Sequence, residues 1–125
     1  MHKSRFCALV IDCKVDDIDA AGRFWSAALG RELAPPDPEG PTYRTLKTGD
    51  DEPIMLLQKV DHPSRVHLDI ETDDVDAEVA RLEALGARRI EKIHTWWIME
   101  APTGHRFCVV RPQRGPLGER ANQWP

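Results

Sequence analysis

The stretch Arg65-Val-His-Leu-Asp-Ile-Glu71, followed by Asp73-Asp-Val-Asp-Ala77, decides the fold of this chain because it occurs twice. Residues 10–20 align with residues 67–77 without a gap, and the two copies share four aspartates and one alanine. A helical run that ends in Leu-Gly follows each copy, at Leu29-Gly30 and Leu85-Gly86. A repeat of this size predicts that the chain is built from two copies of one structural unit.

Composition limits the class of protein. A chain of 125 residues with 41% hydrophobic and 30% charged residues is typical of one soluble globular domain, here residues 1–125. We expect no membrane span and no signal peptide, because no apolar run is long enough and the start lacks a hydrophobic core. A net charge of -4 argues against a nucleic-acid partner. The three cysteines show no zinc-type spacing, which favours reduced thiols in a cytoplasmic protein.

Hydrophobic periodicity and turn residues predict the same plan in both halves. In the first module, about residues 5–60, we expect a strand at 6–13, a helix from Asp16 or Asp17 to about Leu29, a loop at 35–41, and strands at 43–48 and 54–60. In the second module, about residues 65–111, we expect a strand at 65–71, a helix at about 74–85, and strands at 88–93, 95–100 and 106–111. The polar tail 112–125 is expected to lie loosely on the surface, with Trp124 able to pin its end.

The opening strand of the second module shows which side faces the core. Strand alternation places Val66, Leu68 and Ile70 against the helix and turns His67, Asp69 and Glu71 to the other face. By the repeat, Val10 and Asp12 take the equivalent places in the first module. The helices are expected to bury broad apolar stripes: Ile18, Ala21, Phe24, Trp25, Ala28 and Leu29 in the first, and Val75, Val79, Leu82 and Leu85 in the second.

Neither module can bury its own sheet and helix alone, so two modules side by side are predicted to share a curved mixed sheet. The helices would cover its outer face and the strands would enclose a cup. This is an α+β fold made of two βαβββ-type modules. We expect a ligand to bind on the concave side of the sheet, because small-molecule sites are typically concave.

The residues also carry a resemblance to a known family. The chain resembles the vicinal oxygen chelate superfamily, in its glyoxalase-like and bleomycin-resistance branch, over roughly residues 6–111. The resemblance rests on the paired halves, on Phe24-Trp-Ser-Ala-Ala-Leu-Gly30, on the spacing from Asp74 to Leu85-Gly86, and on Ala101-Pro-Thr-Gly-His-Arg-Phe-Cys-Val-Val110. It implies the glyoxalase/bleomycin resistance fold, a small-molecule ligand and a homodimer.

Metal-dependent members of that superfamily hold an ion with four side chains, two from each half. Carried over by position, His67 fills its corner, whereas its repeat equivalent is Val10, which cannot bind a metal. The corner on the last strand falls on Cys108. The counterpart of Cys108 in the first half falls on Met55 or Leu57, or on Gln58 if the register slips. We therefore expect no metal site and no cofactor, with a divalent metal as the alternative.

The candidate substrate-binding residues are those expected to line the cup: Asp12, His67, Asp69, Trp96, Trp97 and Cys108. His67 is also the candidate catalytic residue, because histidine titrates near neutral pH. The competing interpretation makes it a pocket-lining residue hydrogen-bonded to Asp12 or Asp69. Cys108 is a buried filler unless its thiol is activated. Trp96 and Trp97 lie on opposite sides of one strand, and the sequence leaves open which of them faces the cup.

Three functional hypotheses follow. In the first, a glyoxalase-like protein binds a small organic molecule in its cup without a complete metal site. In the second, the chain is a metal-dependent lyase, isomerase or dioxygenase centred on His67, or uses His67 with Asp69 without metal. In the third, it is a non-catalytic interaction module. The ligand itself is left open, and so is whether the chain is an enzyme.

Overall fold

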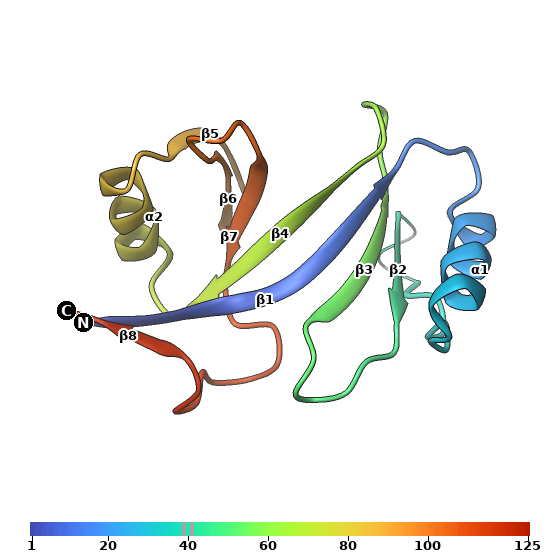
Figure 1. The fold of residues 1–125 in the computed structure, drawn as a ribbon, viewed down its shortest axis with the longest axis horizontal. Helices are drawn as coiled ribbons and strands as arrows, with labels where there is room; N and C mark the ends of the chain where they lie inside the picture. Colours follow the sequence, from blue (N-terminus) through green and yellow to red (C-terminus); the bar gives the residue numbers. More distant parts are fainter. Residues whose placement is uncertain (39, 41) are drawn as a thin grey trace. The chain divides into compact units, whose positions relative to one another are not determined.

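The computed structural model describes residues 1–38, 40 and 42–125 of the chain, and its two helices and mixed sheet confirm the predicted α+β fold (Figure 1). Positions 39 and 41 of the predicted loop 35–41 lie outside the described residues. In chain order the elements are β1 (His2–Cys13), α1 (Ile18–Leu29), β2 (Tyr43–Leu46), β3 (Ile54–Lys59), β4 (Arg65–Thr72), α2 (Val75–Ala84), β5 (Arg88–Ile93), β6 (Trp96–Glu100), β7 (Arg106–Val110) and β8 (Asn122–Trp124). The strand order is β2-β3-β1-β4-β7-β6-β5, and β8 pairs with β1.

Two compact units make up the chain. The continuous unit comprises Ala8–His67, and the split unit combines Met1–Cys7 with Leu68–Pro125. Both β1 and β4 supply residues to each unit. The division therefore falls inside two strands and not at the short linker 61–64 between the two predicted modules.

In the continuous unit, β1 runs parallel to β3, and β2 pairs antiparallel with the other edge of β3. Helix α1 lies against β2 and β3 (Figure 1). The residues buried between helix and strands are Ile11, Cys13, Ile18, Leu46 and Leu57. An isolated bridge from Leu33 to Leu46 stands where the repeat would place a further strand. The first module is therefore βαββ with one residual bridge.

In the split unit, β4 pairs parallel with β7, and β6 pairs antiparallel with both β7 and β5. Helix α2 packs on β5, β6 and β7. Its core consists of Val79, Leu82, Met99 and Val109. The second module has the complete βαβββ order that the sequence predicts.

Aspartates begin both helices, as the repeat predicts. The Asp17 carboxylate accepts hydrogen bonds from the N–H groups of Asp19 and Ala20, and the Asp74 carboxylate accepts one from Ala77. These N–H groups have no partner inside the helix, so the side chains supply one. Gly30 caps the end of α1 with a left-handed φ of 65°, and Gly86 follows α2 with a φ of 107°.

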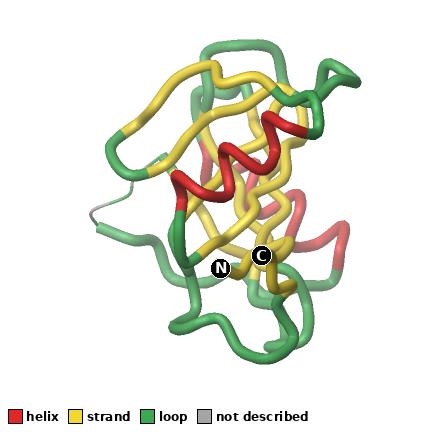
Figure 2. The backbone as a smooth tube through the Cα atoms, turned by 90° about the vertical axis from the view of Figure 1, so that its left-hand side faces the viewer, coloured by secondary structure: helices red, strands yellow, loops and turns green. Residues whose placement is uncertain are grey.

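The two chain ends pair with each other in the split unit, which the sequence did not reveal. β1 begins at His2, four residues before the predicted start, and its first residues pair antiparallel with β8. Figure 2 shows the two termini side by side. The indole N–H of Trp124 donates to the hydroxyl of Ser4 at 2.8 Å, and the Arg81 guanidinium lies 3.9 Å from the centre of the indole ring. The tail therefore ends in a strand, although Trp124 does pin it as expected.

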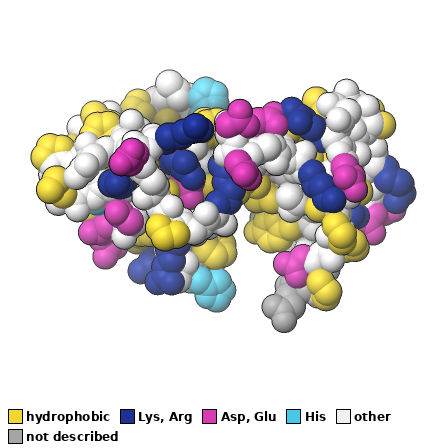
Figure 3. Space-filling model, turned by 90° about the horizontal axis from the view of Figure 1, so that it is seen from below, with side chains coloured by type: hydrophobic (Ala, Val, Ile, Leu, Met, Phe, Trp, Pro, Cys, Tyr) yellow, Lys and Arg dark blue, Asp and Glu magenta, His cyan; other side chains and the backbone are white. Residues whose placement is uncertain are grey.

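Several residues predicted to be buried are exposed, and Figure 3 shows hydrophobic side chains reaching the surface. The exposed fractions are 62% for Phe24, 44% for Leu29, 67% for Leu85, 54% for Val66 and 45% for Leu68. The prediction that these side chains are buried was therefore wrong. Of the three strand residues expected to face the helix, only Ile70 packs against the α2 core. The core under each helix is narrower than the apolar stripe in the sequence.

Neither described helix has the length and apolarity that a membrane-spanning helix needs.

Candidate functional site

The face of β1 opposite α1 carries the first group of candidate residues. Ile11 and Cys13 belong to the core beneath α1. Because side chains alternate along a strand, Val10 and Asp12 project from the opposite face. Both are nearly inaccessible to solvent, with exposed fractions of 2% and 3%. A carboxylate at this depth requires compensation, since a buried charge without a partner is strongly unfavourable.

His67 provides that compensation. Its Nδ1 lies 2.7 Å from Oδ2 of Asp12, and the exposed fractions of the two side chains are 12% and 3%. With Asp12 ionised, Nδ1–H donates to the carboxylate. This arrangement fixes the orientation and tautomer of the ring, so Nε2 becomes the nitrogen with the lone pair. An imidazole held in this way can act as a base, an acid or a metal ligand.

The second oxygen of Asp12 is less well satisfied. Among the described residues, Oδ1 is buried and has no hydrogen-bond partner. An orphaned buried acceptor typically costs about 1–3 kcal/mol of folding free energy. Buried polar groups without a partner are rare in folded proteins, and a catalytic or binding role is one of the reasons for which they occur. In the Asp12–His67 pair, one carboxylate oxygen is therefore hydrogen-bonded to the ring while the other lacks a partner among the described residues.

Gln58 lies next to this pair, which settles the register that the sequence left open. Asp12 is the register partner of Gln58 across β1 and β3, just as Asp69 is the partner of Cys108 across β4 and β7. Gln58 is thus the repeat equivalent of Cys108. Its side-chain amide donates to the Tyr43 hydroxyl at 3.1 Å.

Met55 and Leu57, the other two residues considered as equivalents of Cys108, lie on the opposite face of β3. Both pack in the core on the α1 side. The alignment onto either of them was therefore wrong by one residue or more. The face opposite α1 also presents Leu56 beside Val10, so apolar and polar side chains share it.

In the split unit, Asp69 and Cys108 stand side by side on β4 and β7. Carboxylate and thiol are both possible metal ligands, and a thiolate suits zinc better than magnesium or manganese.

The structure distinguishes the two tryptophans. Trp97 packs against the core under α2, and the guanidinium of Arg89 lies 5.2 Å from its ring centre. Trp96 is on the opposite side of β6, the side to which Cys108 and its partner Ile98 belong. Of the two, Trp96 is the one that shares a face with Asp69 and Cys108.

The thiols differ in environment. Burial, together with the nearby carboxylates of Glu71 and Asp69, raises the pKa of Cys7 to about 12. Burial and the neighbouring Asp12 also raise the pKa of Cys13. Both groups are therefore protonated at neutral pH and chemically inert. Cys108 is only partly buried.

Sequence reasoning did not select Gln58 or Tyr43 for the site. Gln58 was considered only as a metal corner, and Tyr43 only as the start of a strand. The signal that could have found Gln58 is the strand pairing itself, because the same offset joins Asp12 to Gln58 and Asp69 to Cys108.

Comparison with known proteins supports the resemblance noted in the sequence. The family model described as "Glyoxalase-like domain" matches residues 8–110. A search of curated proteins found no match.

Solved structures share the fold at low identity. Methylmalonyl-CoA epimerase from Mycobacterium tuberculosis matches with a TM-score of 0.60 and 17% identity, over 86% of this chain and 87% of that one. The epimerase from Streptomyces coelicolor, in complex with 2-nitronate-propionyl-CoA, matches with a TM-score of 0.58 and 20% identity, over 87% and 98%. The Mn(II)-bound glyoxalase from Novosphingobium aromaticivorans matches with a TM-score of 0.60 and 20% identity, over 95% of this chain but 44% of that one.

Proposed function

Because the chain belongs to the glyoxalase-like domain family, within the vicinal oxygen chelate superfamily, we propose that it binds a small organic molecule through His67. The observation that carries this proposal is the Asp12–His67 pair, in which a buried carboxylate orients an imidazole. The pair lies on the face of β1 that α1 leaves uncovered. Apolar Leu56, which is only partly buried on the same face, suits a ligand with both a polar and a hydrocarbon part.

The ligand class can be narrowed by chemistry. Nε2 of His67 recognises an acidic hydrogen or, when protonated, an oxygen that carries negative charge. An acyl thioester that also carries a free carboxylate, such as methylmalonyl-CoA, offers both, and methylmalonyl-CoA epimerase, which shares the fold, has been solved in complex with that compound and with 2-nitronate-propionyl-CoA. We therefore place acyl thioesters first among the ligands to test. The proposal does not require a metal ion.

The test is a thermal-shift titration of the untagged protein with methylmalonyl-CoA, with free coenzyme A as the comparison. A ligand that binds only the folded state stabilises it by RT ln(1 + [L]/Kd), about 2.7 kcal/mol at a hundred times Kd. We expect H67A to weaken binding at least tenfold. H105A is the matched control, because His105 is exposed in a turn and contacts Thr103. Equal binding by H67A and wild type would remove His67 from the site.

A second function, proton transfer at a carbon next to a carbonyl, is favoured by the same pair. Asp12 holds Nδ1, so Nε2 is placed to take a proton from a bound ligand, as a general base does. Exchange of the ligand's C–H for deuterium in heavy water, followed by proton NMR, would detect this step. If H67Q still binds the ligand but loses exchange, the chain is an enzyme. If wild type binds the ligand without exchange, binding is the function.

Metal content is a separate measurement. Elemental analysis of protein purified without an affinity tag is expected to find much less than one zinc or manganese per chain. A stoichiometric ion that is lost in H67A would replace metal-free binding with a metal-dependent activity of the same family.

A further inference from the structure

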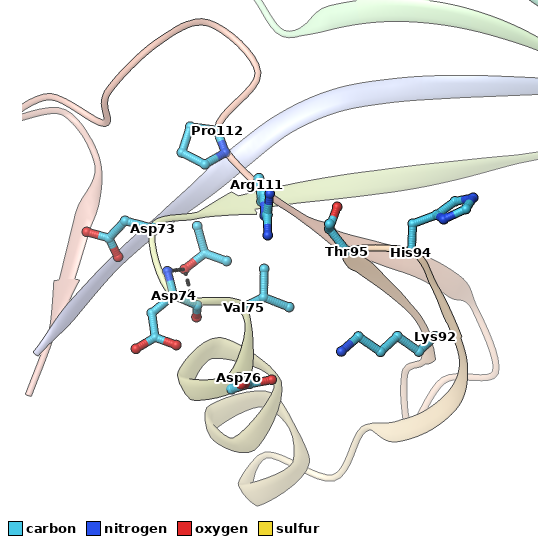
Figure 4. A pocket seen from close by; sticks show the side chains of 10 residues that line it. Asp73, Asp74, Val75, Asp76, Lys92, His94, Thr95, Arg111 and Pro112 are labelled. Atoms are coloured by element: carbon cyan, nitrogen blue, oxygen red, sulfur yellow. Dashed lines mark hydrogen bonds between the residues drawn. The ribbon is translucent and has the colours of Figure 1, made fainter. Parts of the chain in front are cut away.

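A pocket of about 430 Å³ opens in the split unit (Figure 4), and its lining includes neither Asp12 nor His67. It lies between the start of α2, the turn from β5 to β6, and the end of β7. Val75 forms part of its apolar lining, and the charged side chains of Lys92, Arg111 and Asp76 surround it.

The nearby acidic groups are mostly engaged elsewhere. Oδ1 of Asp73 accepts a hydrogen bond from the backbone N–H of Lys3 at 2.8 Å. Oδ1 of Asp74 accepts one from Ala77 at 3.0 Å, which caps α2. Figure 4 shows both carboxylates pointing away from Lys92 and Arg111. Their charges are therefore partly neutralised by backbone dipoles on the far side of the pocket.

The basic groups are not engaged. Within the described residues, neither Lys92 nor Arg111 makes a side-chain hydrogen bond or ion pair. In Figure 4, Lys92 extends from β5 toward α2, and Arg111 is directed toward Val75. Two cations thus converge on one space. Asp76 is the acidic side chain of the pocket that has no hydrogen bond or ion pair to any other described residue. The groups left to meet a ligand carry a net positive charge.

We propose that this pocket binds a small anion bearing a carboxylate or phosphate group, held between Lys92 and Arg111. Arginine matches the paired oxygens of such a group, and lysine adds a compact second charge. The site does not depend on the amino end of α2, because Asp74 already occupies that end. Asp76 repels an anion and weakens the site. The proposal therefore predicts that removing the charge of Asp76 strengthens anion binding.

The experiment is an NMR titration of the ¹⁵N-labelled protein, with inorganic phosphate in one series and succinate in the other. We expect saturable shifts of the amides of Val75, Asp76 and Lys92, weakening as sodium chloride is raised. K92Q and R111Q should each weaken binding about tenfold, the loss of one charge-assisted hydrogen bond. D76N should strengthen it several-fold. K14Q changes the net charge equally at an exposed lysine of the other unit and should have no effect.

The spectra also show whether each variant is folded, so loss of binding and loss of structure are distinguishable. Tighter binding of phosphate or of succinate would identify the anion class, and either result supports the proposal. It would be overturned if neither anion shifts these amides, or if K92Q and R111Q bind like wild type. D76N binding more weakly than wild type would also overturn it.

Discussion

Asp12 and His67 are 55 positions apart in the chain, yet Oδ2 of the first and Nδ1 of the second lie 2.7 Å apart. Both belong to the repeated segment, where Val10 is the equivalent of His67 and Asp69 the equivalent of Asp12. The repeat therefore gives one half a histidine and the other a valine. The contact joins an aspartate of the first copy to the histidine of the second.

The substitution D12N tests how this contact sets the ring. An amide can donate to Nδ1, which would move the imidazole proton to Nε2. We expect ¹⁵N spectra of His67 to show a protonated Nδ1 in wild type and a mixture of tautomers in the variant. Ligand binding through Nε2 should weaken about tenfold, while stability falls by about 1–2 kcal/mol. D61N, at an exposed aspartate, should leave both unchanged, and an unaltered tautomer in D12N would contradict the assignment.

Glu78 makes the fold sensitive to acid. Burial opposes its ionisation, but hydrogen bonds from Arg81, His2 and Ser4 outweigh burial and lower its pKa below the usual 4.5. A lowered pKa contributes stability above the unfolded value and loses it as the pH falls through the folded value. We expect urea denaturation to show a declining free energy of unfolding below about pH 5, and E78Q to flatten this decline.

Removing the same carboxylate entirely should be more damaging. E78A leaves Arg81 and His2 without their shared partner, and breaking a buried pair costs about 3–5 kcal/mol. E83Q is the control, because the ion pair of Glu83 with Arg89 is at the surface, with exposed fractions of 39% and 41%. If E78A and E83Q lose equal stability, the buried network contributes no more than a surface pair.

Thiol reactivity should separate the three cysteines. With the pKa of Cys7 raised to about 12 and that of Cys13 also raised, neither forms much thiolate at pH 8. Iodoacetamide is therefore expected to label one thiol of the native protein, Cys108, and mass spectrometry would locate it. C108S should abolish rapid labelling. Rapid modification of Cys7 in the folded state would show that its burial is not maintained in solution.

Gly30 tests the cost of a left-handed residue at a helix end. Its φ is 65°, and a Cβ added there would meet no atom within 4 Å. G30A should therefore lower stability by about 1 kcal/mol through backbone strain alone. G118A is the matched control, since Gly118 also has open space and lacks a left-handed φ. Equal melting temperatures for the two variants would remove the conformational argument.

The pairing of the two chain ends can be tested at Trp124. W124A removes both the hydrogen bond to Ser4 and the stacking with Arg81, and it should lower stability by about 2–3 kcal/mol. W124F keeps a ring for Arg81 but not the donor, so it should fall between W124A and wild type. Thermal unfolding measures all three. A W124A protein as stable as wild type would mean that β8 adds nothing to the fold.

The sequence predicted those parts of the fold that depend on local interactions present in both copies of the repeat. Asp17 and Asp74 begin helices because their carboxylates meet free N–H groups, a local effect that appears in both copies. The start of β1 was missed because His2, Lys3 and Ser4 are polar. They become a strand only through a partner that lies at the other end of the chain.

The candidate site was less accessible to sequence reasoning. Ile54-Met-Leu-Leu57 is apolar at every position, so alternation could not show which face Gln58 takes. Periodicity likewise marks an apolar stripe on a helix without showing how much strand lies beneath it, which is why Phe24 and Leu85 were wrongly predicted to be buried. From the sequence, Asp12 and Asp69 were equally plausible partners of His67. In the fold, the Asp12 carboxylate lies within hydrogen-bonding distance of the His67 ring.

The pairing of His2–Ser4 with Asn122–Trp124 has a consequence for biosynthesis. A ribosome adds residues in chain order, so the first of these segments is made well before the second. All residues of the Ala8–His67 unit are present once His67 has been added. That unit can therefore fold before Asn122–Trp124 are made, whereas His2–Ser4 cannot pair with β8 until then.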